Sequence, residues 1–146
     1  TGKNVAPAKI ESKFVNSPFI EQVLVVGNDR KYIAALIVPA FDLILYMMKE
    51  KGFYFDESKL VYAEVNGMNS CIEVGEDVIN NPMVKELIEG EINRINEYLE
   101  DYETIKEYTI LPRKFTEERG ELTPTLKLKN RVIFEHYGDV IDNMYK

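Results

Sequence analysis

Apolar residues change their spacing from one segment of the chain to the next. Residues 22–27 and 32–38 are nearly continuous runs of β-favouring apolar residues, separated by the turn formers at 28–31. This arrangement predicts a β-hairpin. Because neither run alternates with polar residues, we expect two central strands that are covered on both faces.

Other segments show helical spacing or a turn signal. A third strand is predicted at 106–111, closed by Pro112. Residues 53–79 show no sustained period and are predicted as loop with short helix, whereas 115–122 is a polar loop that ends in a turn at Gly120. The predicted helices cover residues 7–15, 41–51, 82–99, 127–136 and 139–145. Together these elements predict an α+β class: a small mixed domain with a central sheet of about three strands, including a β-hairpin, flanked by helices.

Composition limits the kind of protein that this chain can be. A chain of 146 residues with 45% hydrophobic content can bury a core as one domain. The formal charge of −7 argues against nucleic acid as a partner, because binding to a phosphate backbone depends on clustered cations. Cys71 is the single cysteine, which excludes an internal disulfide and suits a reducing cytoplasm. With His136 as the single histidine, we predict no zinc site and no other metal site.

The amino-terminal end and the longest apolar run bear on targeting. The longest run, residues 32–41, is about half of the ~20 residues that span a bilayer, so no membrane span is predicted. The chain starts at Thr1 without an initiator methionine or a secretory pattern. We interpret Thr1 as a cut inside a longer chain.

The stretch GELTPTLKLKNR at 120–131 places two lysines on either side of one leucine. In one interpretation, Thr123 caps a helix whose first residue is Pro124, and the lysines are merely solvated. In the other, one ammonium group is delivered to a site. If the stretch is extended, Lys127 and Lys129 share a face, whereas in a helix they diverge by roughly 200°.

Several stretches match one family in order and spacing. The chain resembles the carboxyl-terminal lid domain of AMP-forming acyl-CoA synthetases, in the long-chain fatty acid branch. The matching stretches are residues 2–7 with 10–11, 17–23 with 25–27, 35–39, 105–106, 110–112, 115–116 and 120–127. The resemblance implies that residues 1–146 are a single lid domain whose partner is the enzyme's own amino-terminal domain.

The same resemblance implies a two-step reaction. A fatty acid and ATP give an acyl-adenylate and pyrophosphate, and CoA then displaces AMP to give the thioester. ATP, Mg²⁺ and the acyl chain would be held mainly by the absent amino-terminal domain. The lid would rotate between the steps, and this fragment alone would be inactive.

The family pattern also implies roles for particular residues. Lys127 looks like the catalytic lysine of the adenylation step; Lys129 is the alternative that spacing alone leaves open. In the wider superfamily glycine commonly precedes this lysine, and here Leu126 stands in that place, as the long-chain branch tolerates. The loop that contains Gly2 and Lys3 resembles the segment that lines the CoA pantetheine tunnel.

A second hypothesis from another class is a free-standing acidic module that binds a ligand or a protein without catalysis. Neither His136 nor Cys71 has a visible activating partner in the sequence, and Glu11 is interpreted as structural. Fatty substrates leave peripheral membrane contact open as an alternative, although no strongly basic amphipathic helix is present.

Overall fold

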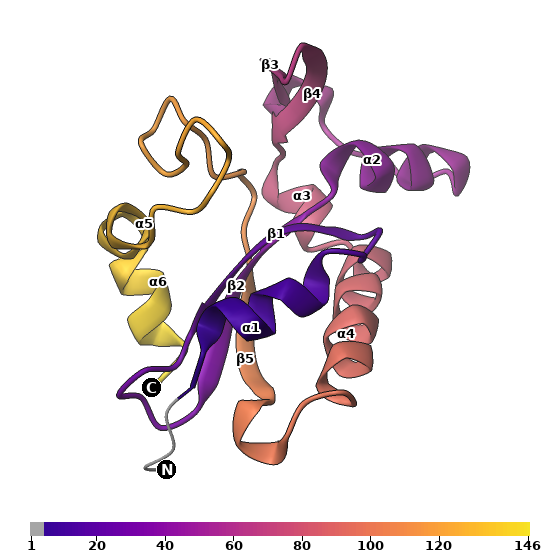
Figure 1. The fold of residues 1–146 in the computed structure, drawn as a ribbon. Coiled ribbons are helices and arrows are strands. Elements are labelled where there is room, and N and C mark those ends of the chain that lie inside the picture. Colours follow the sequence, from indigo (N-terminus) through magenta and orange to yellow (C-terminus); the bar gives the residue numbers. More distant parts are fainter. Residues whose placement is uncertain (1–4) are drawn as a thin grey trace.

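A three-stranded sheet is the centre of the computed structural model, which describes residues 5–146 (Figure 1). The strand order is β1–β2–β5, where β1 (Ile20–Val26) and β2 (Ile33–Pro39) form an antiparallel hairpin. β5 (Ile105–Ile110) lies parallel to β2 on its other side. The predicted α+β class, the hairpin and the third strand are confirmed.

Two hydrophobic cores cover the two faces of the sheet. Every residue of β2 is fully or largely buried, as its continuous apolar run predicts for a central strand. β1 is also covered on both faces, since Val23 and Val25 lie in one core and Leu24 and Val26 in the other, but it is an edge strand, so only its predicted central position is wrong. Its backbone is partly satisfied by side chains, since the Glu11 carboxylate accepts a hydrogen bond from Val25 N–H at 2.8 Å. This contact gives Glu11 the structural role that the sequence suggested.

The helices are divided between the two faces. α1 (Pro7–Glu11), which continues as the short 3₁₀ helix η1 (Ser12–Phe14), packs with α4 (Pro82–Asn96) on one face. Helices on the other face contribute to the larger core, and in Figure 1 α5 and α6 lie across the sheet from α4. They are α2 (Phe41–Glu50), α3 (Glu76–Ile79), α5 (Asn130–His136) and α6 (Gly138–Asn143).

A second hairpin lies in the segment that was predicted as loop and short helix. β3 (Val61–Val65) and β4 (Met68–Glu73) pair antiparallel and form a separate two-stranded sheet. Asn66 and Gly67 join them, with φ of 52° and 78°. Asn-Gly with positive φ at both positions is the preferred two-residue hairpin turn, so the prediction missed a signal that the sequence carries. The 3₁₀ helices η2 (Glu57–Lys59) and η3 (Asp101–Glu103) complete the long connection from β2 to β5.

The first carboxyl-terminal helix begins later than predicted. α5 starts at Asn130 instead of residue 127, because Leu126 has a φ of 66° and Leu128 forms an isolated antiparallel bridge with Leu122. Both features are incompatible with a helix over 126–128. None of the helices formed by residues 5–146 combines the length and the apolar content needed to cross a bilayer.

Candidate functional site

The segment Gly120–Lys129, here called the lysine loop, leaves and re-enters the domain at one place. At its base, Lys129 N–H donates to the Glu121 carbonyl at 2.8 Å. One residue further in, Leu122 and Leu128 form the antiparallel bridge. Gly120, with a φ of 74°, turns the chain into the loop. These contacts hold the two ends of the loop together.

Thr123 closes the tip of the lysine loop as a tight turn. Its N–H donates to the Lys127 carbonyl at 2.8 Å, and its carbonyl accepts from Leu126 N–H at 2.8 Å. Its hydroxyl oxygen also accepts from Lys127 N–H at 3.0 Å. Both backbone groups of Lys127 are therefore bonded to Thr123. The alternative in which Thr123 caps a helix that starts at Pro124 is not what the structure has.

The two lysines of the loop are both exposed. Neither the Lys127 nor the Lys129 ammonium forms a hydrogen bond or ion pair with any residue of the part of the chain described, 5–146. The stretch between them is not helical, because α5 begins only at Asn130. Lys127 lies in the tight turn and Lys129 at the entrance to α5. Which of the two lysines acts in catalysis stays a prediction.

Leu126, which directly precedes Lys127, has left-handed backbone geometry. Its φ is 66°, a region that costs a residue with a Cβ roughly 1–2 kcal/mol and costs glycine almost nothing. The turn thus supplies a physical reason to expect glycine at this position. In this chain the leucine side chain lines a cavity beside the loop, together with Leu122.

Replacement of Leu126 separates backbone strain from side-chain packing. Leu126→Gly and Leu126→Ala both remove the side chain beyond Cβ, yet only glycine relieves the positive φ. We expect the glycine variant to be more stable to unfolding than the alanine variant by about 1 kcal/mol. Urea denaturation of the two variants measures the difference. Equal stability would mean that the turn relaxes without cost.

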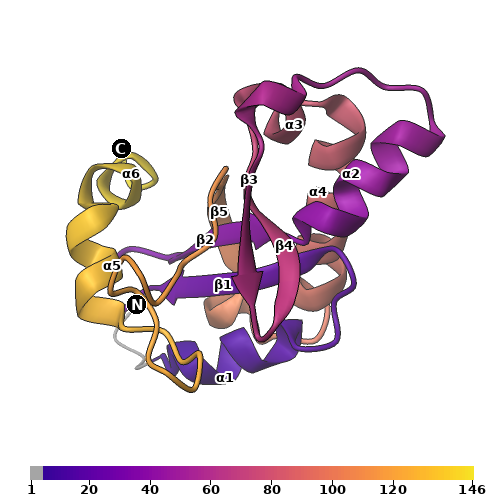
Figure 2. The ribbon, with the colours of Figure 1, turned by 90° about the horizontal axis from the view of Figure 1, so that it is seen from above.

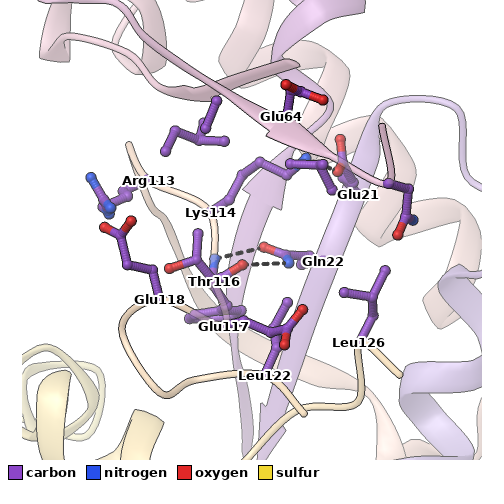
Figure 3. A pocket seen from close by; sticks show the side chains of 15 residues that line it. Glu21, Gln22, Glu64, Arg113, Lys114, Thr116, Glu117, Glu118, Leu122 and Leu126 are labelled. Atoms are coloured by element: carbon purple, nitrogen blue, oxygen red, sulfur yellow. Dashed lines mark hydrogen bonds and ion pairs between the residues drawn. The ribbon is translucent and has the colours of Figure 1, made fainter. Parts of the chain in front are cut away.

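A cavity of about 430 Å³ lies between the lysine loop and the β3–β4 hairpin. Hairpin residues 63–66 form one wall, residues 113–118 another, and Glu21 and Gln22 of β1 contribute the floor (Figure 3). In Figure 2 the β3–β4 hairpin lies over β1. Residues of this hairpin and of the lysine loop line the same cavity. The β3–β4 hairpin, which the sequence analysis missed, therefore lines the same cavity as Leu126, the residue that precedes Lys127.

Polar contacts fix residues 113–116 within this cavity. The Gln22 side chain donates to the Phe115 carbonyl at 3.0 Å and accepts from Phe115 N–H at 2.8 Å, like a strand partner (Figure 3). Lys114 is buried and forms an ion pair with Glu21. Arg113 pairs with Glu73 at 2.6 Å. Sequence reasoning gave no role to these residues, since pairs so distant along the chain leave no local pattern.

Glu121, at the base of the lysine loop, is completely buried. One carboxylate oxygen accepts from Thr116 N–H at 3.2 Å, and the other lies 2.7 Å from His136 Nδ1 on α5. A buried carboxylate is costly without such partners. Burial raises the pKa of the neighbouring Tyr137, and the Glu121 charge raises it further. His136 thus has a partner that the sequence did not reveal.

The remaining candidate residues are placed as follows. Gly2 and Lys3 lie outside the described residues. Cys71 is buried, its thiol donates to the Glu73 carbonyl at 3.2 Å, and burial raises the pKa of the thiol above its usual range. Such a thiol is a poor nucleophile. Within residues 5–146, no three His, Cys, Asp or Glu side chains are grouped so that they could hold a metal ion.

Comparison with known proteins identifies the class of domain. The sequence profile described as AMP-binding enzyme C-terminal domain matches residues 1–73. The A-PCP didomain of carboxylic acid reductase from Segniliparus rugosus, solved in complex with AMP, has the same fold. It superposes with a TM-score of 0.65 at 22% identity, over 97% of this chain and 16% of that chain.

Curated relatives match over nearly the whole chain. Long-chain-fatty-acid–CoA ligase FadD15 from Mycobacterium tuberculosis is 33% identical over 147 residues, which cover 99% of this chain and 21% of the relative. Long-chain-fatty-acid–CoA ligase 1 from Homo sapiens is 26% identical, over 99% of this chain and 20% of the relative. The chain therefore belongs to the AMP-binding enzyme C-terminal domain family, as the motifs indicated. It spans about a fifth of the length of these relatives.

Proposed function

We propose that this chain is the carboxyl-terminal lid of a long-chain fatty acid–CoA ligase. The complete enzyme would convert a fatty acid and ATP to an acyl-adenylate and pyrophosphate, and then transfer the acyl group to CoA with release of AMP. Membership of the family and relatives named as such ligases, matched over 99% of this chain, support the proposal. They favour it over a free-standing module without catalysis.

The role proposed for Lys127 follows from the charges of the adenylation step. The fatty acid carboxylate attacks the α-phosphorus of ATP, so negative charge concentrates where the two anions meet. A positioned ammonium stabilises that charge most strongly in the transition state. Lysine suits this role because it carries a compact charge on a long stem. Lys127 would be carried to this point by the lid and withdrawn before the second step.

The observation that carries this proposal is the state of Lys127. Its backbone N–H and carbonyl are both bonded to Thr123, while its exposed ammonium has no partner among residues 5–146. A side chain that served the fold would be paired or packed. Here the backbone is held and the ammonium is exposed to solvent, as is also the case for Lys129. The arrangement suits delivery of a cation to an anionic site on another domain.

The other substrates and Mg²⁺ are assigned to the absent amino-terminal domain. Among residues 5–146, no group of three or more His, Cys, Asp or Glu side chains is suited to hold a metal ion. For CoA, we propose that Gly2 and Lys3 line the pantetheine tunnel after the lid has rotated. Glycine there would let the backbone approach the thiol arm closely.

Turnover by the complete protein tests the proposal. We expect AMP and acyl-CoA to form only when ATP, CoA and a fatty acid are all present, with the highest kcat/KM in the long-chain part of a fatty acid ladder. Residues 1–146 alone should show no turnover, because they would lack the nucleotide site. A complete protein that binds fatty acid but releases no AMP would contradict the proposal.

A further inference from the structure

The Glu121–His136 pair lies at the place where the lysine loop joins the domain. Glu121 is the second residue of the loop, and its carbonyl accepts a hydrogen bond from the N–H of Lys129, the last loop residue. His136 lies on α5, the helix that follows directly. The pair therefore joins the entrance of the loop to the far end of the helix that leaves it.

The contacts of Glu121 extend to a third segment. Its backbone N–H donates to the Thr116 carbonyl at 2.9 Å, and its carboxylate accepts from Thr116 N–H at 3.2 Å. The other carboxylate oxygen lies 2.7 Å from His136 Nδ1, and an ionised carboxylate would accept a hydrogen bond from Nδ1–H there. One buried side chain thus bonds to the segment before the loop and to the helix after it. Among residues 5–146, no side chain has a hydrogen bond or ion pair with any other carboxylate between 116 and 136.

Burial of a carboxylate costs more free energy than burial of an apolar side chain at the same place in a turn. An apolar residue would fill the same space without desolvation of a charge. The carboxylate, however, makes directed bonds, and a chain of such bonds allows one geometry where packing alone allows several. Those bonds end at the base of the loop that carries Lys127. This placement suggests that the pair sets the direction of the loop.

We propose that Glu121 and His136 are positioning residues for Lys127. They would hold the lysine loop in a fixed position relative to α5. The inference rests on the proposed adenylation role of Lys127, although the geometry of the loop can be measured without it. Neither residue would touch the substrate. Each acts through the backbone bond from Lys129 N–H to the Glu121 carbonyl and through the bridge between Leu122 and Leu128.

Two pairs of variants in the complete protein test the inference. His136→Phe keeps a ring and loses the donor, whereas His136→Asn retains an N–H donor near the place of Nδ1. Glu121→Ala removes the carboxylate, whereas Glu121→Gln retains its shape. Glu135→Gln, which changes an exposed neighbour on α5, is the matched control.

Hydrogen exchange of the lysine-loop amides is the first measurement. We expect His136→Phe and Glu121→Ala to speed exchange of the amides of Leu126, Lys127 and Lys129 at least 10-fold, while His136→Asn and the control stay within about 2-fold of wild type. Unchanged protection in His136→Phe would overturn the inference. If Glu121→Ala fails to fold, the two His136 variants still decide the result.

The half-reactions are the second measurement. A misplacement of about 1 Å can cost about 10²-fold in rate, so we expect His136→Phe to slow adenylate formation 10- to 100-fold and to leave thioester formation from supplied adenylate within about 2-fold. His136→Asn should recover most of the loss. Equal losses in both half-reactions would overturn the positioning role. A wild-type protein that makes no adenylate would instead refute the proposed function, and hydrogen exchange would still judge the positioning of the loop.

Discussion

Lys127→Ala in the complete enzyme is expected to slow acyl-adenylate formation by about 10²- to 10³-fold. This is the usual loss when one charge-stabilising contact made in the transition state is removed. Formation of acyl-CoA from supplied acyl-adenylate should be nearly unchanged, because the lid would present a different face in that step. Single-turnover release of pyrophosphate and of AMP measures the two steps separately.

Lys129→Ala is the matched control for this prediction. Lys129 is an exposed lysine of the same loop, two residues away, and its ammonium likewise has no partner among residues 5–146. Its replacement should change adenylate formation by less than about 3-fold. If Lys129→Ala carried the large loss instead, the catalytic assignment would move to that residue. Equal losses in both half-reactions for Lys127→Ala would mean a structural role.

Glu21→Ala is expected to destabilise the domain by about 3 kcal/mol. The substitution leaves the Lys114 ammonium, only 6% exposed, without its counter-charge in the cavity beside the lysine loop. Lys114→Met should cost about 1 kcal/mol or less, since Glu21 is 41% exposed and water can solvate it. Urea denaturation of residues 1–146 measures both free energies of unfolding.

The asymmetry between the two partners is the informative part of this experiment. Glu118→Ala removes an exposed carboxylate from the same cavity and should change stability by no more than about 0.5 kcal/mol. Glu21→Ala with an equally small effect would mean that Lys114 reaches solvent at little cost. Similar large losses for Glu21→Ala and Lys114→Met would mean that packing dominates over charge.

Much of the fold could be predicted because its signals are local. The continuous apolar run of β2 indicated a strand buried on both faces, and Asn81 and Pro82 marked the start of α4. The edge position of β1 could not be predicted in this way, because it depends on where β5 pairs after a long connection. The β3–β4 hairpin could have been found from Asn66 and Gly67, had that dipeptide been weighed above the irregular apolar spacing.

The candidate site was predictable only in part. Lys127 was reached through resemblance, because spacing alone did not separate it from Lys129. The left-handed geometry of Leu126 was invisible in the sequence, since leucine rarely adopts it. Burial of Glu121 against His136 was also out of reach, as it depends on how α5 packs back on the segment before the loop. Such pairs arise from tertiary structure and leave no periodic pattern.

The long connection between β2 and β5 has a consequence for how the domain is made. β1 and β2 are close in sequence and can pair early, but β5 joins the sheet only after residues 40–104 have been synthesised and folded back. Closure of so long a segment delays the parallel pairing. On the ribosome, the edge of β2 that pairs with β5 therefore stays open while residues 40–104 are synthesised, and an unpaired strand edge can pair with other chains during that time.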